Sequence, residues 1–375
     1  MDYRDTPEEA EFRASLRAWL AENIPAGWDK IEDRDEAARM QRAWHRTLYE
    51  AGYIGMSWPK EYGGRSLSPM YEAILNEEAG NLNAPRLPSV GYIGRAVFTY
   101  GSEEQKKRFL PPLLSGEAQW CQGFSEPEAG SDLASLRTLA RLDGDHYVVN
   151  GQKMWTSGGQ YADWCLLLAR TDPDVPKHKG ISAFLVSMRE PGVTVRPIVL
   201  ASGEAETCEV FWDDVRIPVA QRLGAPGEGW RIAMTTVAYE RGPADIGFIA
   251  SYRHTLRRVE RLAAERGLLE RPETRKKLAA AYVRGEVLRL NCMEQLSLRV
   301  SGREPGPEGS VAKLLWADAE QSLQHLAMDI LGADCMTGAA GEWLGSYFTS
   351  RPVSVYGGSA QIQKNIIARM LGLPR

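Results

Sequence analysis

The sequence predicts an α+β protein in which two helical regions flank a β-rich middle. Residues 1–117 and 226–375 carry apolar side chains at helical spacing, whereas residues 118–225 hold short β-rich runs separated by Gly, Pro and Asp. A chain of 375 residues exceeds one average domain. We therefore expect an N-terminal helical domain, a middle antiparallel β domain and a C-terminal helical bundle, with boundaries near 117 and 225.

Helix-start signals support the two helical domains. The segment Thr6–Glu9 combines an N-cap, a proline at the first helical position and the acidic partner of a capping box. Ser102 repeats the signal before another apolar run, and we expect Ser310 to cap a later helix. Helical spacing between these points is clearest at Ile249, Tyr252, Leu256, Val259 and Leu262.

The middle block, residues 118–225, has short β-rich runs separated by turn residues, as expected for short strands. Asn150-Gly151 follows an apolar run and is typical of a tight hairpin turn. The expected strands after it are Trp164–Ala169, Ile181–Met188, Val193–Leu200 and Cys208–Trp212. Together they predict a compact antiparallel sheet.

Composition excludes several classes of function. A net charge of -4 gives no broad basic field, so nucleic-acid binding is not expected. Five cysteines without a C-x-x-C pair, and five scattered histidines, argue against a disulfide framework and against a metal site. The polar N-terminus and the absence of a long apolar run predict neither a signal peptide nor a membrane span. The default compartment is the cytoplasm.

Two segments of the middle block, 122–132 and 151–159, are rich in small polar residues. Gly and Ser allow a ligand to approach the backbone and supply hydrogen-bond donors, and Trp155 offers a face for a planar ring. The same residues also fit a pair of turns around a buried Trp. Neither segment is a G-x-G-x-x-G fingerprint or a P-loop.

Together with the closing runs Val355–Gln363 and Ile366–Arg375, these segments resemble the flavin-binding motifs of the acyl-CoA dehydrogenase family. The resemblance covers nearly the whole chain and its α–β–α order. It implies an FAD-dependent enzyme that desaturates an acyl-CoA thioester and passes electrons to an electron-transfer flavoprotein. Fatty-acid or steroid side-chain β-oxidation is the implied setting. The length and branching of the acyl group do not follow from the sequence.

The family's cofactor contacts carry over by position. The resemblance implies that Gln122, Phe124 and Ser125 meet the flavin ring, and that Ser131 lies near the pyrophosphate and the substrate. It further implies that Trp155 packs on the ring and that Ser157 offers a hydrogen bond near its reactive nitrogen. From the last helices, the implied FAD contacts are Ser359 and Gln361.

The catalytic carboxylate is displaced in this sequence. Many family members hold it directly after the tyrosine of the closing motif, where this chain has Gly357. A minority hold it on a long helix directly before an arginine, which matches Glu240 before Arg241. We therefore expect Glu240 to be the base and Arg241 and Gly357 to bind substrate. A glycine at 357 keeps its backbone N–H for the thioester carbonyl and leaves room for a bulky acyl group.

Motifs that reach the FAD of a neighbouring subunit in homotetrameric members are altered. Arg266 keeps the arginine of the first motif without its Phe-Gly pair, and Asp329 stands where the second has glutamine. An aspartate beside the cofactor's phosphates would be repulsive. The chain is therefore expected to pair with a related subunit, or to form a homodimer or homotetramer with altered contacts. Two further alternatives are a flavin oxidase of the same fold and a non-catalytic, partner-stabilising subunit.

Overall fold

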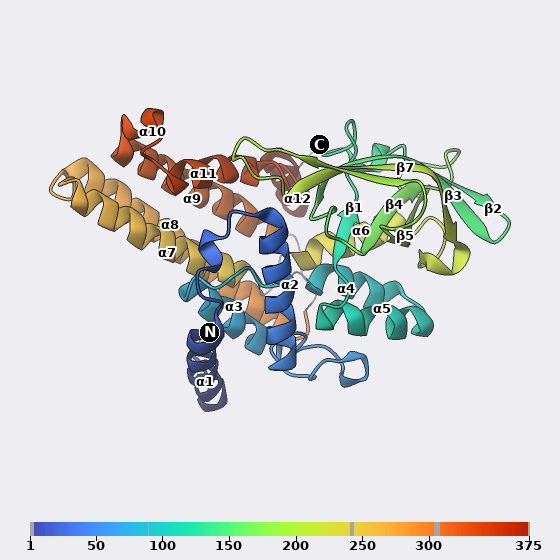
Figure 1. The fold of residues 1–375 in the computed structure, drawn as a ribbon, viewed down its shortest axis with the longest axis horizontal. Coiled ribbons are helices and arrows are strands. Elements are labelled where there is room, and N and C mark those ends of the chain that lie inside the picture. Colours follow the sequence, from blue (N-terminus) through green and yellow to red (C-terminus); the bar gives the residue numbers. More distant parts are fainter. Residues whose placement is uncertain (1–3, 89, 241–243, 304–307, 374–375) are drawn as a thin grey trace. The chain divides into compact units, whose positions relative to one another are not determined.

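The computed structural model describes residues 4–88, 90–240, 244–303 and 308–373, with residues 239, 240, 244 and 245 described by their backbone alone. Two compact units are present: a helical unit (1–30, 67–87 and 241–375) and a sheet unit (31–66 and 88–240). Figure 1 labels most of their helices and strands. The helical unit joins segments of both predicted helical domains, and the boundaries near 117 and 225 stay a prediction.

The helical unit is built around three long helices. α7, α8 and α9 share an apolar core that includes Tyr252, Val259 and Leu323, so the predicted helical face of α7 is confirmed. The helices of this unit are α1 (Pro7–Asn23), α3 (Pro69–Asn81), α7 (Ala244–Glu265), α8 (Pro272–Val300), α9 (Glu308–Leu331), α10 (Asp334–Thr337), α11 (Glu342–Ser350) and α12 (Ala360–Met370), with 3-10 turns at Trp28–Lys30 and Arg351–Ser354.

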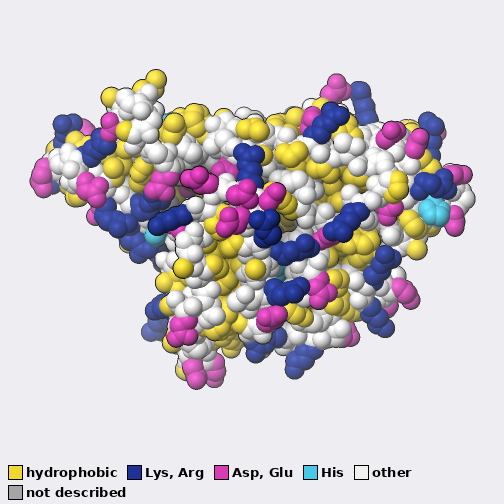
Figure 2. Space-filling view, viewed as in Figure 1, with side chains coloured by type: hydrophobic (Ala, Val, Ile, Leu, Met, Phe, Trp, Pro, Cys, Tyr) yellow, Lys and Arg dark blue, Asp and Glu magenta, His cyan; other side chains and the backbone are white. Residues whose placement is uncertain are grey.

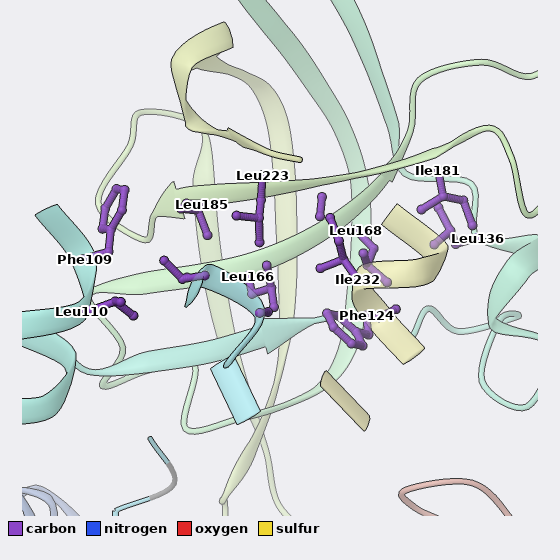
Figure 3. Packing of buried hydrophobic residues seen from close by; sticks show 14 of the residues in the cluster. Phe109, Leu110, Phe124, Leu136, Leu166, Leu168, Ile181, Leu185, Leu223 and Ile232 are labelled. Atoms are coloured by element: carbon purple, nitrogen blue, oxygen red, sulfur yellow. The ribbon is translucent and has the colours of Figure 1, made fainter. Parts of the chain in front are cut away.

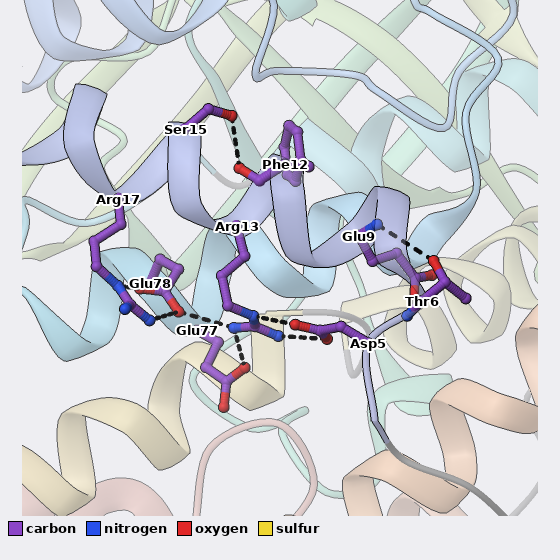
Figure 4. A network of polar contacts seen from close by, with 9 residues as sticks. All are labelled: Asp5, Thr6, Glu9, Phe12, Arg13, Ser15, Arg17, Glu77 and Glu78. Atoms are coloured by element: carbon purple, nitrogen blue, oxygen red, sulfur yellow. Dashed lines mark hydrogen bonds and ion pairs between the residues drawn. The ribbon is translucent and has the colours of Figure 1, made fainter.

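A cluster of charged side chains joins α1 to α3 (Figure 4). Arg13 donates to Asp5, Glu77 and Glu78, and Arg17 donates to the same Glu78. Burial raises the pKa of Glu78, but its hydrogen bonds to the two arginines outweigh burial and hold that pKa below its usual range. The side chain of Glu78 is only 2% exposed, so this network fixes the packing of the two helices.

The predicted helix starts are confirmed at two of three positions. Thr6 and Glu9 form the expected capping box, as do Ser102 and Gln105. Ser310 is not a cap, because α9 already includes Glu308 and Ser310 lies buried inside the helix. A serine after a Gly- and Pro-rich run of sequence signals a nearby helix, but it does not fix the residue at which the helix begins.

In its described residues, the sheet unit combines an eight-stranded sheet with four α-helices. The strands run in the order β6-β7-β3-β2-β4-β5-β8, and β1 pairs with β4. Most pairings are antiparallel as predicted, while β1–β4 and β2–β4 are parallel. The elements are α2 (Arg34–Glu50), α4 (Val90–Tyr100), α5 (Glu103–Ser115), α6 (Gly229–Glu240), β1 (Trp120–Gly123), β2 (Leu139–Asp143), β3 (His146–Ser157), β4 (Trp164–Arg170), β5 (Ile181–Ser187), β6 (Val193–Ile198), β7 (Thr207–Pro218) and β8 (Arg222–Leu223), with 3-10 turns at Lys60–Tyr62, Leu133–Ser135 and Val219–Gln221.

The core of the sheet unit lies on both faces of β4. Leu166 and Leu168 face a cluster that includes Ile232 of α6, as Figure 3 shows. Cys165 faces a second cluster that includes Val210 of β7. Because both faces of β4 are covered, its sequence reads as a continuous apolar run rather than an alternating one.

The Asn150-Gly151 pair lies within β3, so the predicted hairpin turn at this site is wrong. Asn150 exchanges two hydrogen bonds with Asp214 of β7, at 2.9 and 3.0 Å, across a bulge between the strands. Glycine is needed at 151 because a Cβ there would lie 2.5 Å from the Thr138 hydroxyl. The turn that joins β2 to β3 is at Gly144, which has a φ of +61°.

Charged side chains of both signs are mixed over the face drawn in Figure 2. That face shows no broad single-sign field, in keeping with the net charge of -4. Within the described residues, no helix is both long enough and apolar enough to cross a membrane.

Candidate functional site

A buried ion pair joins the two small-polar segments of the sheet unit. Lys153 Nζ donates to Glu126 Oε1 at 2.8 Å and to the Phe124 carbonyl at 3.0 Å, and the lysine side chain has no exposed surface. Glu126 also accepts the backbone N–H groups of Arg137 and Thr138, at 2.6 and 2.9 Å. The segments 122–132 and 151–159 are thus cross-linked from inside.

Each member of this pair favours the charged form of the other. Burial lowers the pKa of Lys153 to about 8, and the charge of Glu126 opposes a larger fall. Burial also raises the pKa of Glu126, but the charge and hydrogen bond of Lys153, together with the hydrogen bonds from Thr138 and Arg137, bring that pKa below its usual range. A charged pair in a buried place needs good hydrogen-bond geometry, which both groups have here.

Trp155 is presented outward on a strained bulge. β3 carries one extra residue relative to β7 between Lys153 and Thr156. Trp155, inside this bulge, has a φ of +63° and is 52% exposed. Positive φ is costly for a bulky residue and persists where the surroundings impose it, often at functional sites. The alternative of turns around a buried Trp is therefore excluded.

The Met154 N–H supplies part of that constraint. It donates to the Ser125 carbonyl at 2.9 Å, directly before Trp155. The bulged residue is thus flanked by a backbone hydrogen bond and by the buried Lys153. Because both contacts reach the same segment, 124–126, the position of Trp155 depends on that segment.

The other predicted flavin contacts of the sheet unit differ in exposure. Gln122 on β1 is half-buried, and its Nε2 is buried without a hydrogen-bond partner among the described residues. Ser131 and Ser157 are exposed, and Ser125 is half-buried. The side chain of Phe124 packs in the core, which leaves its backbone as the part available to a ligand.

The closing motif forms a turn that α12 holds in place. Gly357 and Gly358 have φ values of +62° and +89°. Gln363, which is fully buried, donates from Nε2 to both of their carbonyls at 3.0 Å. Ser359 caps α12 with its side chain, and Gln361 lies exposed in the first turn of that helix. The predicted FAD contacts Ser359 and Gln361 are therefore adjacent to the predicted substrate contact Gly357.

Lys313 of α9 lies beside this turn. Its ammonium is 4.2 Å from the centre of the Tyr356 ring and 3.7 Å from the position that a Cβ at Gly357 would take. No motif in the sequence points to Lys313, because it reaches the turn from a separate helix more than forty residues earlier in the chain. Gln363, Lys153 and Glu126 were likewise absent from the predicted site residues.

Glu240 is the last residue of α6, and its backbone alone is described. Arg241 lies outside the described residues. The roles of Glu240 as the base and of Arg241 as a substrate contact therefore stay predictions.

The two altered motifs, which in homotetrameric relatives reach the FAD of a neighbouring subunit, form ion pairs within this chain. Arg266 pairs with Asp334, and Lys277 Nζ pairs with Asp329 at 2.6 Å. All four side chains belong to the helical unit. Asp329, which would repel a phosphate, is thus matched with a cation on α8.

The described parts of the chain contain no cluster of metal ligands. No group of three or more His, Cys, Asp or Glu side chains could hold an ion there. All five cysteines are free thiols, as their spacing predicted.

Family profiles match the chain in three consecutive blocks. The acyl-CoA dehydrogenase N-terminal domain matches residues 6–117, the middle domain matches 121–215 and the C-terminal domain matches 227–372. The chain belongs to the acyl-CoA dehydrogenase family. The predicted family is confirmed, and so is the order of helices, sheet and helices.

Relatives within the acyl-CoA dehydrogenase family align over nearly the full length. Acyl-CoA dehydrogenase IpdE1 of Mycobacterium tuberculosis is 40% identical over 97% of this chain and 98% of its own. Acyl-CoA dehydrogenase FadE29 of the same organism is 34% identical over 99% and 98%. Such identity across the whole chain supports enzymatic function for this acyl-CoA dehydrogenase.

Solved structures share the fold. The steroid acyl-CoA dehydrogenase Tcur3481-Tcur3483 has a TM-score of 0.86, 32% identity and full coverage of both chains. The ChsE4-ChsE5 complex from Mycobacterium tuberculosis has a TM-score of 0.84 at 32% identity, again with full coverage. A glutaryl-coenzyme A dehydrogenase in complex with glutaryl-CoA has a TM-score of 0.86 at 27% identity, covering 100% of this chain and 98% of that one.

Proposed function

We propose that this acyl-CoA dehydrogenase uses FAD to desaturate an acyl-CoA thioester to the trans-2-enoyl-CoA, with Glu240 as the base. Family membership supports the reaction class. The observation that carries the cofactor assignment is Trp155, an exposed indole held on a strained bulge beside the segment 124–126. A rigid aromatic face flanked by small polar residues suits a planar ring.

The residues present fit a flavin. The buried Nε2 of Gln122 lacks a partner among the described residues, and a buried donor left unsatisfied costs about 1–3 kcal/mol. A ring acceptor at this place would remove that cost. Bound FAD would accept the hydride that leaves the β carbon. The proposed FAD contacts are Gln122, the Phe124 backbone, Ser125, Ser131, Trp155, Ser157, Ser359 and Gln361.

The chain's own groups supply proton removal and charge stabilisation. The Glu240 carboxylate takes the α proton, which is weakly acidic and needs a positioned base. The Gly357 N–H donates to the thioester oxygen as negative charge develops there. Gln363 supports this role, because it fixes both carbonyls of the Gly357–Gly358 turn and so the orientation of the peptide groups. Arg241 and Ser131 contact the substrate.

A related subunit is proposed to complete the enzyme. Two solved neighbours are complexes that carry two protein names, and they cover this whole chain at 32% identity. Arg266 and Asp329, at the two altered neighbour-facing motifs, are engaged in ion pairs within the chain. The cofactor contacts that these motifs lack would come from the partner. An electron-transfer flavoprotein would then receive the electrons, in the cytoplasm.

The base assignment is tested by anaerobic flavin bleaching in rapid mixing. The holoprotein, alone and co-expressed with a related subunit, is mixed with straight, branched and steroid-derived acyl-CoAs. Glu240→Gln should slow bleaching by about 10²- to 10⁴-fold, the usual contribution of a general base. Glu260→Gln, an exposed glutamate on α7, is the matched control and should bleach at the wild-type rate.

The alternatives to this proposal predict different results in the same experiments. Bleaching of Glu240→Gln at the wild-type rate would show that another group is the base. Hydrogen peroxide release with acyl-CoA identifies an oxidase, and no bleaching with any acyl-CoA identifies a non-catalytic subunit. Full FAD occupancy in an oligomer of this chain alone would refute the need for a related subunit.

A further inference from the structure

α8 carries apolar side chains on two opposite faces. One face is buried in the helical unit and holds Ala281, Gly285, Leu288, Cys292 and Leu296. On the opposite face, Val283, Val287 and Leu290 are 57%, 47% and 45% exposed. A surface helix normally presents polar side chains opposite its buried face. The outer face of α8 therefore suits contact with another protein surface better than contact with water.

The exposed residues of this outer face have the spacing of a helix–helix contact. Ala280, Val283, Val287 and Leu290 follow one another in steps of three, four and three residues, and Ala280 is exposed as well. Alternating steps of three and four keep apolar side chains on one narrow line of a helix, against which a second helix packs. These four residues, the outer stripe, are thus suited to receive another helix.

The outer stripe ends in opposite charges. Lys276 lies four residues before Ala280, and Glu294 lies four residues after Leu290, so both continue the same line. Both side chains are exposed. At 1.5 Å per residue they lie about 27 Å apart along the helix, so they cannot pair with each other. Each charge requires its complement from another molecule.

A second copy of α8 running in the opposite direction supplies that complement. About a two-fold axis level with Gly285, Lys276 of each copy faces Glu294 of the other, and the small Ala280 faces the larger Leu290. A parallel pairing would instead place like charges together. We propose that the outer stripe of α8 is a docking surface for a second copy of this chain, with the two helices antiparallel.

The charges that flank the centre of the outer stripe do not oppose this pairing. Arg284 pairs with Asp318 of α9 at 2.9 Å, and Glu286 pairs with Arg253 of α7 and with Arg289 of α8. These charges are balanced within their own chain, so the two copies bring little uncompensated charge to the two-fold axis. The pairing adds to the related subunit of the proposed function and does not depend on it.

Self-association of the holoprotein tests this proposal. The full chain is prepared with FAD, alone and co-expressed with a related subunit. Sedimentation velocity gives the number of copies of this chain per particle and the Kd between copies. The wild type should hold at least two copies of this chain per particle in both preparations. Val287→Glu, which places a charge in the middle of the outer stripe, should raise the Kd between copies by about 10-fold or more.

Reversal of the end charges tests the antiparallel register. Lys276→Glu and Glu294→Lys should each raise the Kd by about 10-fold, because each change places like charges together twice in a pair of copies. The double variant Lys276→Glu/Glu294→Lys should return the Kd to within about 3-fold of wild type, because the two charges meet across the copies. Glu260→Lys, at an exposed position of α7, is the control and should pair as the wild type does.

Four results would overturn the proposal. They are one copy per particle in the wild type, an unchanged Kd in Val287→Glu, no recovery in the double variant, and loss of the related subunit in place of the second copy. Circular dichroism of each variant checks that its helices are retained. Flavin bleaching is measured separately, so its absence would refute the proposed function and leave this inference standing.

Discussion

Replacing Lys153 with methionine removes the cation from the buried pair while keeping a side chain of similar length. Glu126, which is 8% exposed, would then remain as a buried carboxylate without its counter-charge. The Phe124 carbonyl would lose a donor at 3.0 Å as well. Among the described residues, no other side-chain hydrogen bond links the segment 124–126 to β3, so this link would be lost.

The expected cost follows from these contacts. Removing one partner of a buried ion pair typically costs about 3–5 kcal/mol. Glu126 keeps the backbone N–H groups of Arg137 and Thr138, at 2.6 and 2.9 Å, which continue to stabilise its charge. We therefore expect Lys153→Met to lower the free energy of unfolding by about 3 kcal/mol, at the lower end of that range.

Urea unfolding followed by circular dichroism measures this loss. The matched control is Lys177→Met, because Lys177 also pairs with a carboxylate, Asp132, at 2.7 Å, but with 47% and 61% of the two side chains exposed. An exposed pair is worth about 0–1 kcal/mol. The double variant Lys153→Met/Glu126→Gln should lose less than the sum of its single changes, because no unpaired charge is left behind.

Two results would refute this reasoning. One is a loss for Lys153→Met no greater than for Lys177→Met, which would mean that Glu126 is stabilised by its backbone donors alone. The other is strict additivity in the double variant, which would mean that the two side chains do not act as a pair.

Two further predictions concern the closing turn and a buried histidine. Gly357→Glu, added to the Glu240→Gln variant, should not restore flavin bleaching. Position 357 has a φ of +62°, and a carboxylate there would pair with Lys313. Recovery of the bleaching rate to within about 10-fold of the wild-type rate would contradict this. Burial lowers the pKa of His45, so the unfolded state binds its proton first as pH falls below about 6.5. The free energy of unfolding should therefore fall as pH is lowered from 7 to 5.5. His45→Gln should show a smaller fall when urea titrations at the two pH values are compared. The same fall in His45→Gln as in the wild type would count against His45.

Local signals in the sequence predicted local structure well. The capping boxes at Thr6 and Ser102 depend on residues three positions away, so they could be read without knowing the fold. Asn150-Gly151 misled for the opposite reason. The partner of Asn150, Asp214, lies 64 residues later in the chain, and the pair occurs at a bulge inside β3 rather than at a hairpin turn.

The sequence motifs predicted which residues contact a ligand, and those contacts stay predictions; the motifs did not predict the residues that hold these segments in place. The exposed Trp155 follows from a motif, but its bulge depends on a Lys153–Glu126 pair that bridges two segments. Lys313 approaches the closing turn from another helix, which no spacing in the sequence reveals. Residues that touch a ligand recur in recognisable order, whereas those that hold them in place are set by packing.

The two irregularities in the β3–β7 ladder compensate each other. Val149 faces Val215 and Gly151 faces Trp212, so β7 has one extra residue between these pairs. Between Lys153 and Thr156, β3 has the extra residue instead. Only the stretch from Gly151 to Lys153 is therefore out of phase, and the flanking pairs keep one common register. Deleting one residue from either strand alone would shift every side chain beyond it to the opposite face. Length changes in these strands can be tolerated only in matched pairs, and such a pair would regularise the ladder at the cost of the outward indole.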